Sequence, residues 1–378
     1  TTTTTTIATA GTTIITETGG GGWTLDTQPS SQTRFGLNLD AGARSTWARV
    51  LGTLVHVTAA LLLAVTIWMV YASIPPRTQD EAAPILVRIR PGMSAGQVAD
   101  ELHRQGLIRD KGYFLGVARV LGSETRIQAG TYAVTPGATL FSLLRDFQQG
   151  NVVQVRVTIP EGYTVRDIAR RLAAHGLVDE ERFVRLALGE YRAVVAGTEL
   201  PTLEGYLFPD TYYFTLDMTE EQILAAMLAR FRQVVLPHVE RGGQGLSAHQ
   251  VVTLASIVER EAKVAEERPV IASVYLNRLR IGMPLQADPT VLYALNGNVD
   301  RLLHAHLSVD SPYNTYLYAG LPPGPIASPG LESILAVLYP ADTGYLYFVA
   351  RGDGSSEFSR TLEEHNRAVA QYIRKRNP

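Results

Sequence analysis

The sequence contains no cysteine among its 378 residues. This absence excludes disulfide bonds, cysteine-ligated zinc sites and thiol nucleophiles. The sequence also lacks a large excess of charge of either sign, since its formal net charge is −2 and no basic run occurs. Nucleic acid is therefore not an expected partner. His304 and His306 lie close together, but no HExxH pattern or carboxylate set accompanies them, which favours a surface role over metal binding.

Charged residues are absent between Arg49 and Arg77, where the centre of the segment reads VTAALLLAVTIWMVY. A helix of roughly 20 apolar residues crosses a bilayer core of about 30 Å. A cleaved signal peptide would be shorter and nearer the N-terminus, and a buried helix of a soluble core is the other alternative. We predict one transmembrane helix over residues 47–76. Arginines are more frequent just before it than just after it, which favours a cytoplasmic N-terminus.

The composition on either side of this segment indicates flexible chain. Residues 1–46 are rich in Thr, Gly and Ser and begin with six threonines, which predicts disorder. Residues 77–84 form a short acidic stretch that ends in proline, which is typical of a linker. The remaining residues include enough apolar side chains for a substantial core, and the chain length suggests two or three domains.

An internal repeat follows the linker. The segment IRPGMSAGQVADELHRQGLI at 89–108 aligns without gaps to IPEGYTVRDIARRLAAHGLV at 159–178, and a weaker third copy begins at Thr135. Each copy predicts a strand, a glycine turn, a Ser or Thr N-cap, an amphipathic helix and a closing glycine. These small α+β modules resemble LysM-like units, whose family role is to bind glycan. A plain structural spacer is the alternative for any single copy.

One later helix carries two candidate acids. Ser247 is a suitable N-cap for the segment HQVVTLASIVEREAKVAEE, and the apolar residues of this segment form one stripe on a helical wheel. Glu259 and Glu261 lie on opposite shoulders of the stripe, whereas Arg260 points away from it. A carboxyl beside an apolar face loses solvation, which raises its pKa and suits a general acid. The wheel does not choose between the two glutamates, and solvated glutamates paired with neighbouring cations are the alternative.

Polar and aromatic residues are dense in three other segments. The first, LEGYLFPDTYYF at 203–214, interleaves aromatic rings with carboxylates, a combination that suits sugar rings and their hydroxyls. The second and third are NRLRIGMPLQADPTVLYA and SPYNTYLYAGLPPGPIASPG, the latter with a rigid Gly-Pro turn. Such segments are poor core material and predict a polar groove.

Taken in order, LEGYLFPDTY, ASIVERE, NRLRIGMPLQADPTVLYA, SPYNTY, GLPPGPIASPG, LYFVARGDG and the closing Phe358, His365 and Asn366 closely resemble the YceG-like endolytic murein transglycosylases, the MltG family. The resemblance covers 203 to about 368. It implies an α+β protein with one N-terminal transmembrane helix, a small LysM-like α/β module over 85–153, and a mixed α+β catalytic domain over 154–378. That domain includes the second LysM-like repeat at about 155–180.

The resemblance also implies an activity and a site. Such enzymes cut the MurNAc–GlcNAc bond of peptidoglycan without hydrolysis and leave a 1,6-anhydroMurNAc end, with no cofactor or metal. Glu259, the first glutamate of SIVERE, would be the catalytic residue. The expected substrate-binding residues are Glu204, Tyr206, Asp210, Asn277, Gln286, Asp288, Tyr313, Asn314, Thr315 and Tyr316.

The resemblance implies peptidoglycan glycan strands and the lipid bilayer as partners, together with peptidoglycan synthases. The expected location is the cell (inner) membrane, with a single span and the catalytic domain on the extracytoplasmic face. Two alternatives stay open at this point: a peptidoglycan glycoside hydrolase, with Asp210, Glu204 or Asp288 as the base, and a non-catalytic scaffold that binds the cell wall.

Overall fold

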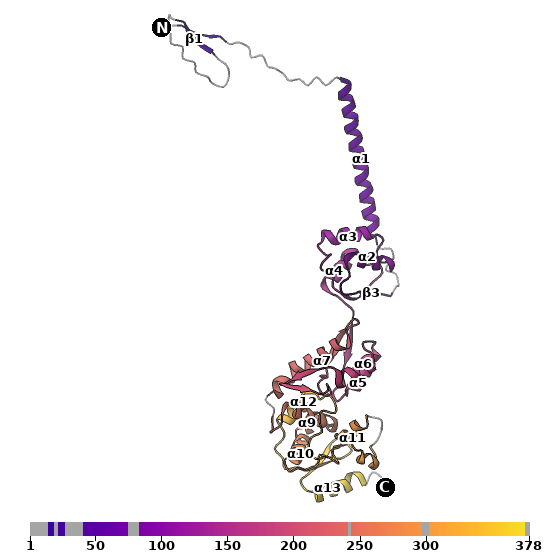
Figure 1. Ribbon diagram of the computed structural model, residues 1–378, viewed down its shortest axis with the longest axis vertical. Coiled ribbons are helices and arrows are strands. Elements are labelled where there is room, and N and C mark those ends of the chain that lie inside the picture. The colour runs from indigo at the N-terminus through magenta and orange to yellow at the C-terminus, as the bar shows by residue number, and fades with distance from the viewer. Residues whose placement is uncertain are drawn as a thin grey trace. The chain divides into compact units, whose positions relative to one another are not determined.

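A computed structural model describes residues 14–18, 22–26, 41–74, 83–240, 243–296 and 302–374, with side chains from 46 to 372. The chain divides into two compact units, Thr1–Tyr71 and Ala72–Pro378. The fold is mixed α+β and mostly helical, and its sheets are small and two-stranded (Figure 1). Most of the predicted tail at 1–46 and linker at 77–84 lies outside the described residues.

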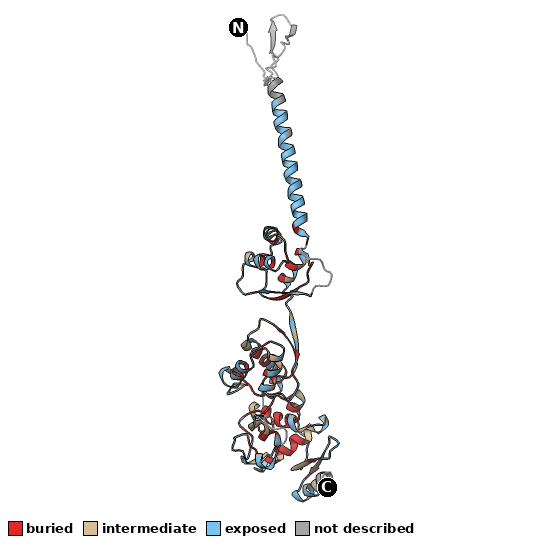
Figure 2. Cartoon of the chain, turned by 90° about the vertical axis from the view of Figure 1, so that its right-hand side faces the viewer, coloured by how far each residue is buried: buried red, intermediate tan, exposed pale blue. Residues whose placement is uncertain are grey.

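The first unit contains a strand pair and one long helix. Ile14–Thr18 (β1) pairs antiparallel with Gly22–Asp26 (β2). Both strands fall within residues 1–46, for which the composition predicted disorder. The helix Ala41–Ser73 (α1) includes an apolar stretch, Thr46–Ser73, of 28 residues with mean hydropathy 2.2, and nearly all of its residues are exposed (Figure 2).

By length and composition, this stretch of α1 is able to cross a membrane. At about 1.5 Å per residue it is longer than a bilayer core of about 30 Å. The hydroxyls of Thr53, Thr58 and Thr66 donate to backbone carbonyls one turn earlier, so these polar groups are satisfied within the helix. The observed helix ends at Ser73, before the Pro75-Pro76 pair, so its end falls three residues short of the predicted 76.

The second unit begins with the first repeat copy and its own core. Its elements are β3 (Ile85–Ile89), α2 (Ala95–Arg104), α3 (Lys111–Val120), β4 (Gly130–Val134) and α4 (Leu140–Gln149). Strands β3 and β4 pair antiparallel, and side chains such as Val87, Leu102 and Phe147 are fully buried between them and the helices. The predicted N-cap is present, because Ser94 and Gln97 form a capping box.

A second, larger core follows, and the second repeat copy is part of it. Its first elements are β5 (Gln154–Thr158), α5 (Val165–Ala174), α6 (Glu180–Arg185), the π-helix η1 (Leu186–Glu190), β6 (Ala193–Val195), β7 (Thr198–Leu200) and β8 (Thr211–Thr215). Helix α5 has the predicted N-cap, Thr164, which forms a capping box with Asp167. Strand β5 pairs with the distant β8, so residues 203–210 are held next to the repeat.

The remaining helices and strands complete the second core. They are α7 (Glu220–Val234), α8 (Leu236–Val239), α9 (Ala248–Glu261), η2 (Ala265–Glu267), α10 (Arg268–Arg280), α11 (Asp288–Ala294), η3 (His304–Ser308), α12 (Leu331–Leu338), β9 (Tyr347–Ala350), β10 (Ser356–Ser359), α13 (Leu362–Val369) and η4 (Ala370–Arg374). Helix α9 packs against α10, α11 and α12, and its residues from Val251 to Val258 are buried.

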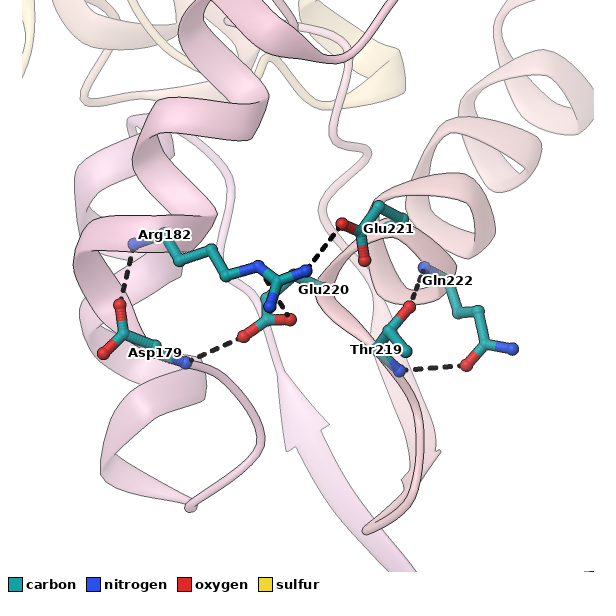
Figure 3. A network of polar contacts seen from close by, with 6 residues as sticks. All are labelled: Asp179, Arg182, Thr219, Glu220, Glu221 and Gln222. Carbon is teal, nitrogen blue, oxygen red and sulfur yellow. Dashed lines mark hydrogen bonds and ion pairs between the residues drawn. The ribbon is translucent and has the colours of Figure 1, made fainter. Parts of the chain in front are cut away.

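Polar contacts at the surface fasten α6 to the start of α7 (Figure 3). Arg182 forms ion pairs with Glu220 at 3.6 Å and with Glu221 at 2.9 Å, and Glu220 also accepts a hydrogen bond from the backbone of Asp179. Because Arg182 is half exposed, each ion pair adds little stability. The contacts mainly fix the relative position of two helix N-termini.

The two repeat copies place equivalent leucines in different cores, so their truncation should act on different parts of the protein. Leu102 and Leu172 are both fully buried. We expect Leu102→Ala and Leu172→Ala each to cost about 2–5 kcal/mol. In calorimetry of the full chain in detergent, Leu102→Ala should lower only the unfolding temperature of the first core. Leu172→Ala should lower only the unfolding temperature of the second core. A shift of both transitions by either variant would show that the two cores unfold together.

Candidate active site

The end of helix α9 places two glutamates in different surroundings. Ser247 and Gln250 cap its N-terminus, and the helix ends after Glu261 because Ala262 is extended, with φ −71° and ψ 118°. Glu259 and Glu261 therefore lie in the last turn, where the partial negative charge of the helix end opposes ionisation of a carboxyl. What each carboxyl contacts beyond the helix decides its state.

Glu259 is enclosed by hydrogen-bond donors. Its side chain is 7% exposed, and Arg268 approaches one carboxylate oxygen at 3.3 Å. The other oxygen accepts hydrogen bonds from the Gly330 backbone N–H at 3.1 Å and the Ser333 hydroxyl at 2.7 Å. Both donors belong to the N-terminal turn of α12. Through these three donors, one of them cationic, the side chain of Glu259 joins α9 to α12 and α10.

A second carboxyl, Glu161, lies beside this arrangement. It comes from the glycine turn of the second repeat, and Arg268 is 3.7 Å from it. Burial and the nearby Glu259 raise the pKa of Glu161, while Arg268 lowers it. A Cβ on Gly330 would lie 2.0 Å from the Glu161 carboxyl, so a side chain at position 330 would require the Glu161 carboxyl to move.

Glu261 has the opposite kind of environment. Burial, followed by the charge of Asp288, raises its pKa to about 7, against smaller opposing effects from the Tyr275 hydroxyl and Arg278. Tyr275 is 1% exposed, and Arg278 is 7% exposed. The Tyr316 hydroxyl donates to Asp288 at 2.5 Å. We call these five residues the Glu261 cluster. Near neutral pH the carboxyl of Glu261 exchanges readily between its acid and ionised forms, as a general acid and base requires.

Arg278 is held in the Glu261 cluster by backbone carbonyls. Its guanidinium donates to the carbonyl oxygens of Leu346 at 2.6 Å and Leu285 at 2.7 Å, and it lies over the ring of Tyr347 at 5.3 Å from the centroid. Burial lowers the pKa of Arg278. Tyr275 and Arg278 are three residues apart on α10, so they share one helix face. Neither residue is among the expected substrate-binding residues, although this spacing next to the predicted Asn277 was a usable signal.

The segment 313–316 is fixed by its own amides and hydroxyls. Asn314 is fully buried and donates to the carbonyl oxygens of Leu307 and Val309. Thr315 is 1% exposed, and its hydroxyl accepts the N–H of Ala287. These two predicted substrate-binding residues therefore use their polar groups within the protein and position their neighbours Tyr313 and Tyr316.

Three other predicted residues have side-chain partners inside the protein, and a fourth does not. The Tyr206 hydroxyl is 2.7 Å from His249, and its ring is only 2% exposed because it packs in the core. Asp210 forms an ion pair with Arg230 at 2.6 Å. The Asn277 amide donates to the carbonyl oxygens of residues 343 and 345. Gln286 differs, since its side chain is exposed and its backbone φ is +48°, next to Asp288 of the Glu261 cluster.

Glu204 is 2% exposed and close to a large cavity. It accepts hydrogen bonds from the Val165 N–H at 3.0 Å and the Tyr293 hydroxyl at 3.3 Å. Burial raises its pKa to about 8, against the smaller effects of these donors. Glu204, Tyr293 and Tyr313 all line a cavity of about 950 Å³ between α5 and α11. Neither Glu259 nor Glu261 lines it, although Arg260, which lies between them in sequence, does.

Metal ligation has no candidate within the part of the chain that the structure describes. No group of three or more His, Asp or Glu side chains there lies close enough together to hold an ion.

Comparison with known proteins identifies the family. The model of the YceG-like family matches residues 87–371, which is more than half of the chain. This chain belongs to the YceG-like family. It is 35% identical to a Bacillus subtilis protein named endolytic murein transglycosylase over 319 residues, which is 80% of this chain and 88% of the relative.

Two further comparisons agree with that assignment. A Streptococcus pneumoniae protein of the same name is 30% identical over 334 residues, covering 80% of this chain and 60% of the relative. The crystal structure of a YceG-like protein from Listeria monocytogenes matches with a TM-score of 0.52 and 34% identity, covering 75% of this chain and 98% of that chain. The resemblance predicted from motifs over 203–368 is confirmed, and the match extends upstream into the first repeat copy.

The raised pKa of Glu204 predicts a pH-dependent stability. In the unfolded chain Glu204 releases its proton near its ordinary pKa of about 4.3, whereas the folded protein retains the proton up to about pH 8. Stability should therefore fall as pH rises between these values. Glu204→Gln, which cannot ionise, should remove this loss, so that its advantage over wild type grows from pH 5 to pH 8.5 by a few kcal/mol at most. Urea unfolding at both pH values measures this, and an equal difference at the two values would contradict it.

Proposed function

We propose that this protein is a membrane-anchored endolytic lytic transglycosylase that acts on nascent peptidoglycan strands. It would cleave the MurNAc–GlcNAc bond and form a 1,6-anhydroMurNAc end. Family membership and the two relatives named endolytic murein transglycosylase support the substrate class. The observation that carries the chemistry is the carboxyl of Glu261, whose pKa of about 7 allows both protonation states at neutral pH.

The choice of proton donor follows from the contacts of the two glutamates. The resemblance favours Glu259, but three donors surround its carboxylate, and the protonated form that a proton donor needs would lose the ion pair with Arg268. Glu261 forms no ion pair with any residue that the structure describes, and the negative Asp288 nearby favours its acid form. We therefore assign the proton transfer to Glu261 and keep Glu259 as the alternative donor. In this assignment Glu259 positions the end of α9.

The reaction needs a single acid that later acts as a base. Protonated Glu261 donates its proton to the glycosidic oxygen, and the C1–O bond breaks with its electron pair on that oxygen. The Glu261 carboxylate then removes the proton from the C6 hydroxyl of MurNAc, whose oxygen attacks C1 of the same ring. Proton and charge balance, and the intramolecular attack has a high effective concentration without an ordered water. Asp288, held by Tyr316, would stabilise the positive charge that develops on the ring.

The predicted substrate-binding residues divide into two groups under this proposal. Gln286, Asp288, Tyr313 and Tyr316 retain exposed surface and would contact the sugars. The others would hold the walls of the groove through the internal contacts described above; they are Glu204, Tyr206, Asp210, Asn277, Asn314 and Thr315.

The long apolar helix α1 would anchor the enzyme in the cell membrane with the N-terminus in the cytoplasm and the catalytic domain outside. The two repeat copies would act as LysM-like modules. Their role would be to bind glycan or to position the enzyme, with peptidoglycan synthases as partners. A glycoside hydrolase is the second candidate, because Asp288 provides another carboxylate beside Glu261. A scaffold without activity is the third.

Replacement of each glutamate separates the proposed roles. Glu261→Gln should reduce digestion of purified sacculi by about 100-fold or more, since the proton donor is lost. Glu259→Gln should retain more activity but melt at a lower temperature, because Arg268 loses its closest anion. The exposed Glu266→Gln is the matched control. An inactive, stably folded Glu259→Gln beside an active Glu261→Gln would transfer the proton donor to Glu259.

Mass spectrometry of the products distinguishes the enzyme classes. We expect anhydro ends from the wild-type protein. A reducing MurNAc end, heavier by one water, would instead establish the hydrolase, and the absence of digestion would favour the scaffold.

The pKa of Glu261 predicts the direction of the pH profile. Activity should fall as pH rises through about 7, because the acid form of Glu261 is lost. Asp288→Asn removes the negative charge that helps to raise this pKa, so the fall should move to lower pH in that variant. Initial rates between pH 5 and 9 measure both. A rate that climbs steadily above neutral pH would contradict the general-acid role.

A further inference from the structure

The cavity between α5 and α11 is separate from the Glu261 cluster and carries an excess of positive charge. Its volume is about 950 Å³, and four arginines line it, namely Arg166, Arg170, Arg171 and Arg260. Asp167 is the lining carboxylate that balances them, and it already forms an ion pair with Arg170 at 3.3 Å. Glu204, the other lining carboxyl, is neutral at pH 7 because burial raises its pKa to about 8. Three arginines therefore remain without a lining anion.

One of these arginines has an unsatisfied donor. Among the residues that the structure describes, the Nε of Arg171 is buried and has no hydrogen-bond partner. A buried N–H without a partner is costly, and a ligand that supplies an acceptor removes that cost. Arg166 has no ion pair within the described ranges, and Arg260 donates only to the backbone carbonyl of Gly162 at 3.2 Å. The cavity thus presents guanidinium donors without acceptors.

The rest of the lining is aromatic and apolar. Tyr163, Tyr293 and Tyr313 contribute rings, with Leu188, Leu292 and Ile326 between them. Tyr293 and Tyr313 are in contact, with ring centroids 4.8 Å apart. A bare phosphate would fill a small part of 950 Å³ and would not use the rings. A peptide with several carboxylates would use both the arginines and the apolar walls.

We propose that this cavity binds a carboxylate-bearing peptide, the class to which the peptide stem of peptidoglycan belongs. The assignment to the stem rests on the proposed function. Arg260 and Pro289 line the cavity and are sequence neighbours of Glu261 and Asp288, so helices α9 and α11 connect the two sites. A glycan strand bound at the Glu261 cluster would then place a peptide substituent against α5, and the cavity would select strands that carry peptides.

Direct binding tests the cavity without reference to catalysis. The probe is the free stem peptide L-Ala-γ-D-Glu-L-Lys-D-Ala-D-Ala, titrated by calorimetry into the full chain in detergent. We expect the double variant Arg166→Gln, Arg171→Gln to weaken binding at least tenfold, and a peptide with amidated carboxyls to bind as weakly. Arg192→Gln, an exposed arginine paired with Glu199, is the matched control and should bind like wild type.

Two results would overturn the proposal. Equal binding of the peptide by the double variant and wild type would show that these arginines do not take part in binding. Displacement of a weak signal by inorganic phosphate, without discrimination between peptide and amidated peptide, would show a general anion site instead. If the double variant does not fold, Arg166→Gln alone carries the test, since Arg166 is exposed on the first turn of α5.

Kinetics connect the cavity to the substrate. On glycan strands that carry stem peptides, the double variant should raise KM about tenfold with little change in kcat. On strands stripped of peptides by an amidase, its KM should equal that of wild type. An equal rise of KM on both substrates would contradict stem recognition. If wild type cleaves neither substrate, the proposed function fails, whereas the peptide titration still decides whether the cavity binds an acidic peptide.

Discussion

The solvation of one carboxyl group controls the chemistry proposed for this protein. Glu261 lies in the final turn of α9, and the chain turns away from the helix at Ala262. Packing of α10 and α11 around that turn removes water from the carboxyl, and Asp288 further disfavours its charge. Glu259, two residues earlier, is equally enclosed but receives donors from α10 and α12. Two neighbouring buried carboxyls therefore have different surroundings, because Glu259 has an arginine and two further donors as partners whereas Glu261 has the anionic Asp288 nearby.

Much of the polar sequence in this region stabilises the site instead of facing the substrate. Asn277 and Asn314 each satisfy two backbone carbonyls, and Thr315 connects its own segment to residue 287. Backbone groups in irregular segments between helices lack the partners of regular secondary structure, so side-chain amides and hydroxyls must serve as their hydrogen-bond partners. A short list of exposed groups, Gln286 and Tyr316 among them, then remains for contact with a ligand.

Local patterns were sufficient for the helices and for the family. The capping boxes at Ser94, Thr164 and Ser247 are present where the sequence predicted N-caps, because capping depends on residues three positions apart. The helix that is long enough to cross a membrane was also predictable, because an uninterrupted run of apolar residues is a local feature of the sequence. The pairing of the strands was harder to predict from the sequence. β5 pairs with β8 across more than 50 residues, and no local signal specifies such a partner.

The sequence by itself determined that an acid would lie at the end of an apolar helix, amid motifs of the YceG-like family. It left two glutamates equivalent on the helical wheel. Only the tertiary structure distinguished them, because the donors around Glu259 come from Arg268 and the start of α12, and the anion near Glu261 comes from α11. The pKa of a buried group depends on neighbours that are distant in sequence, so the helix carrying it cannot specify its charge.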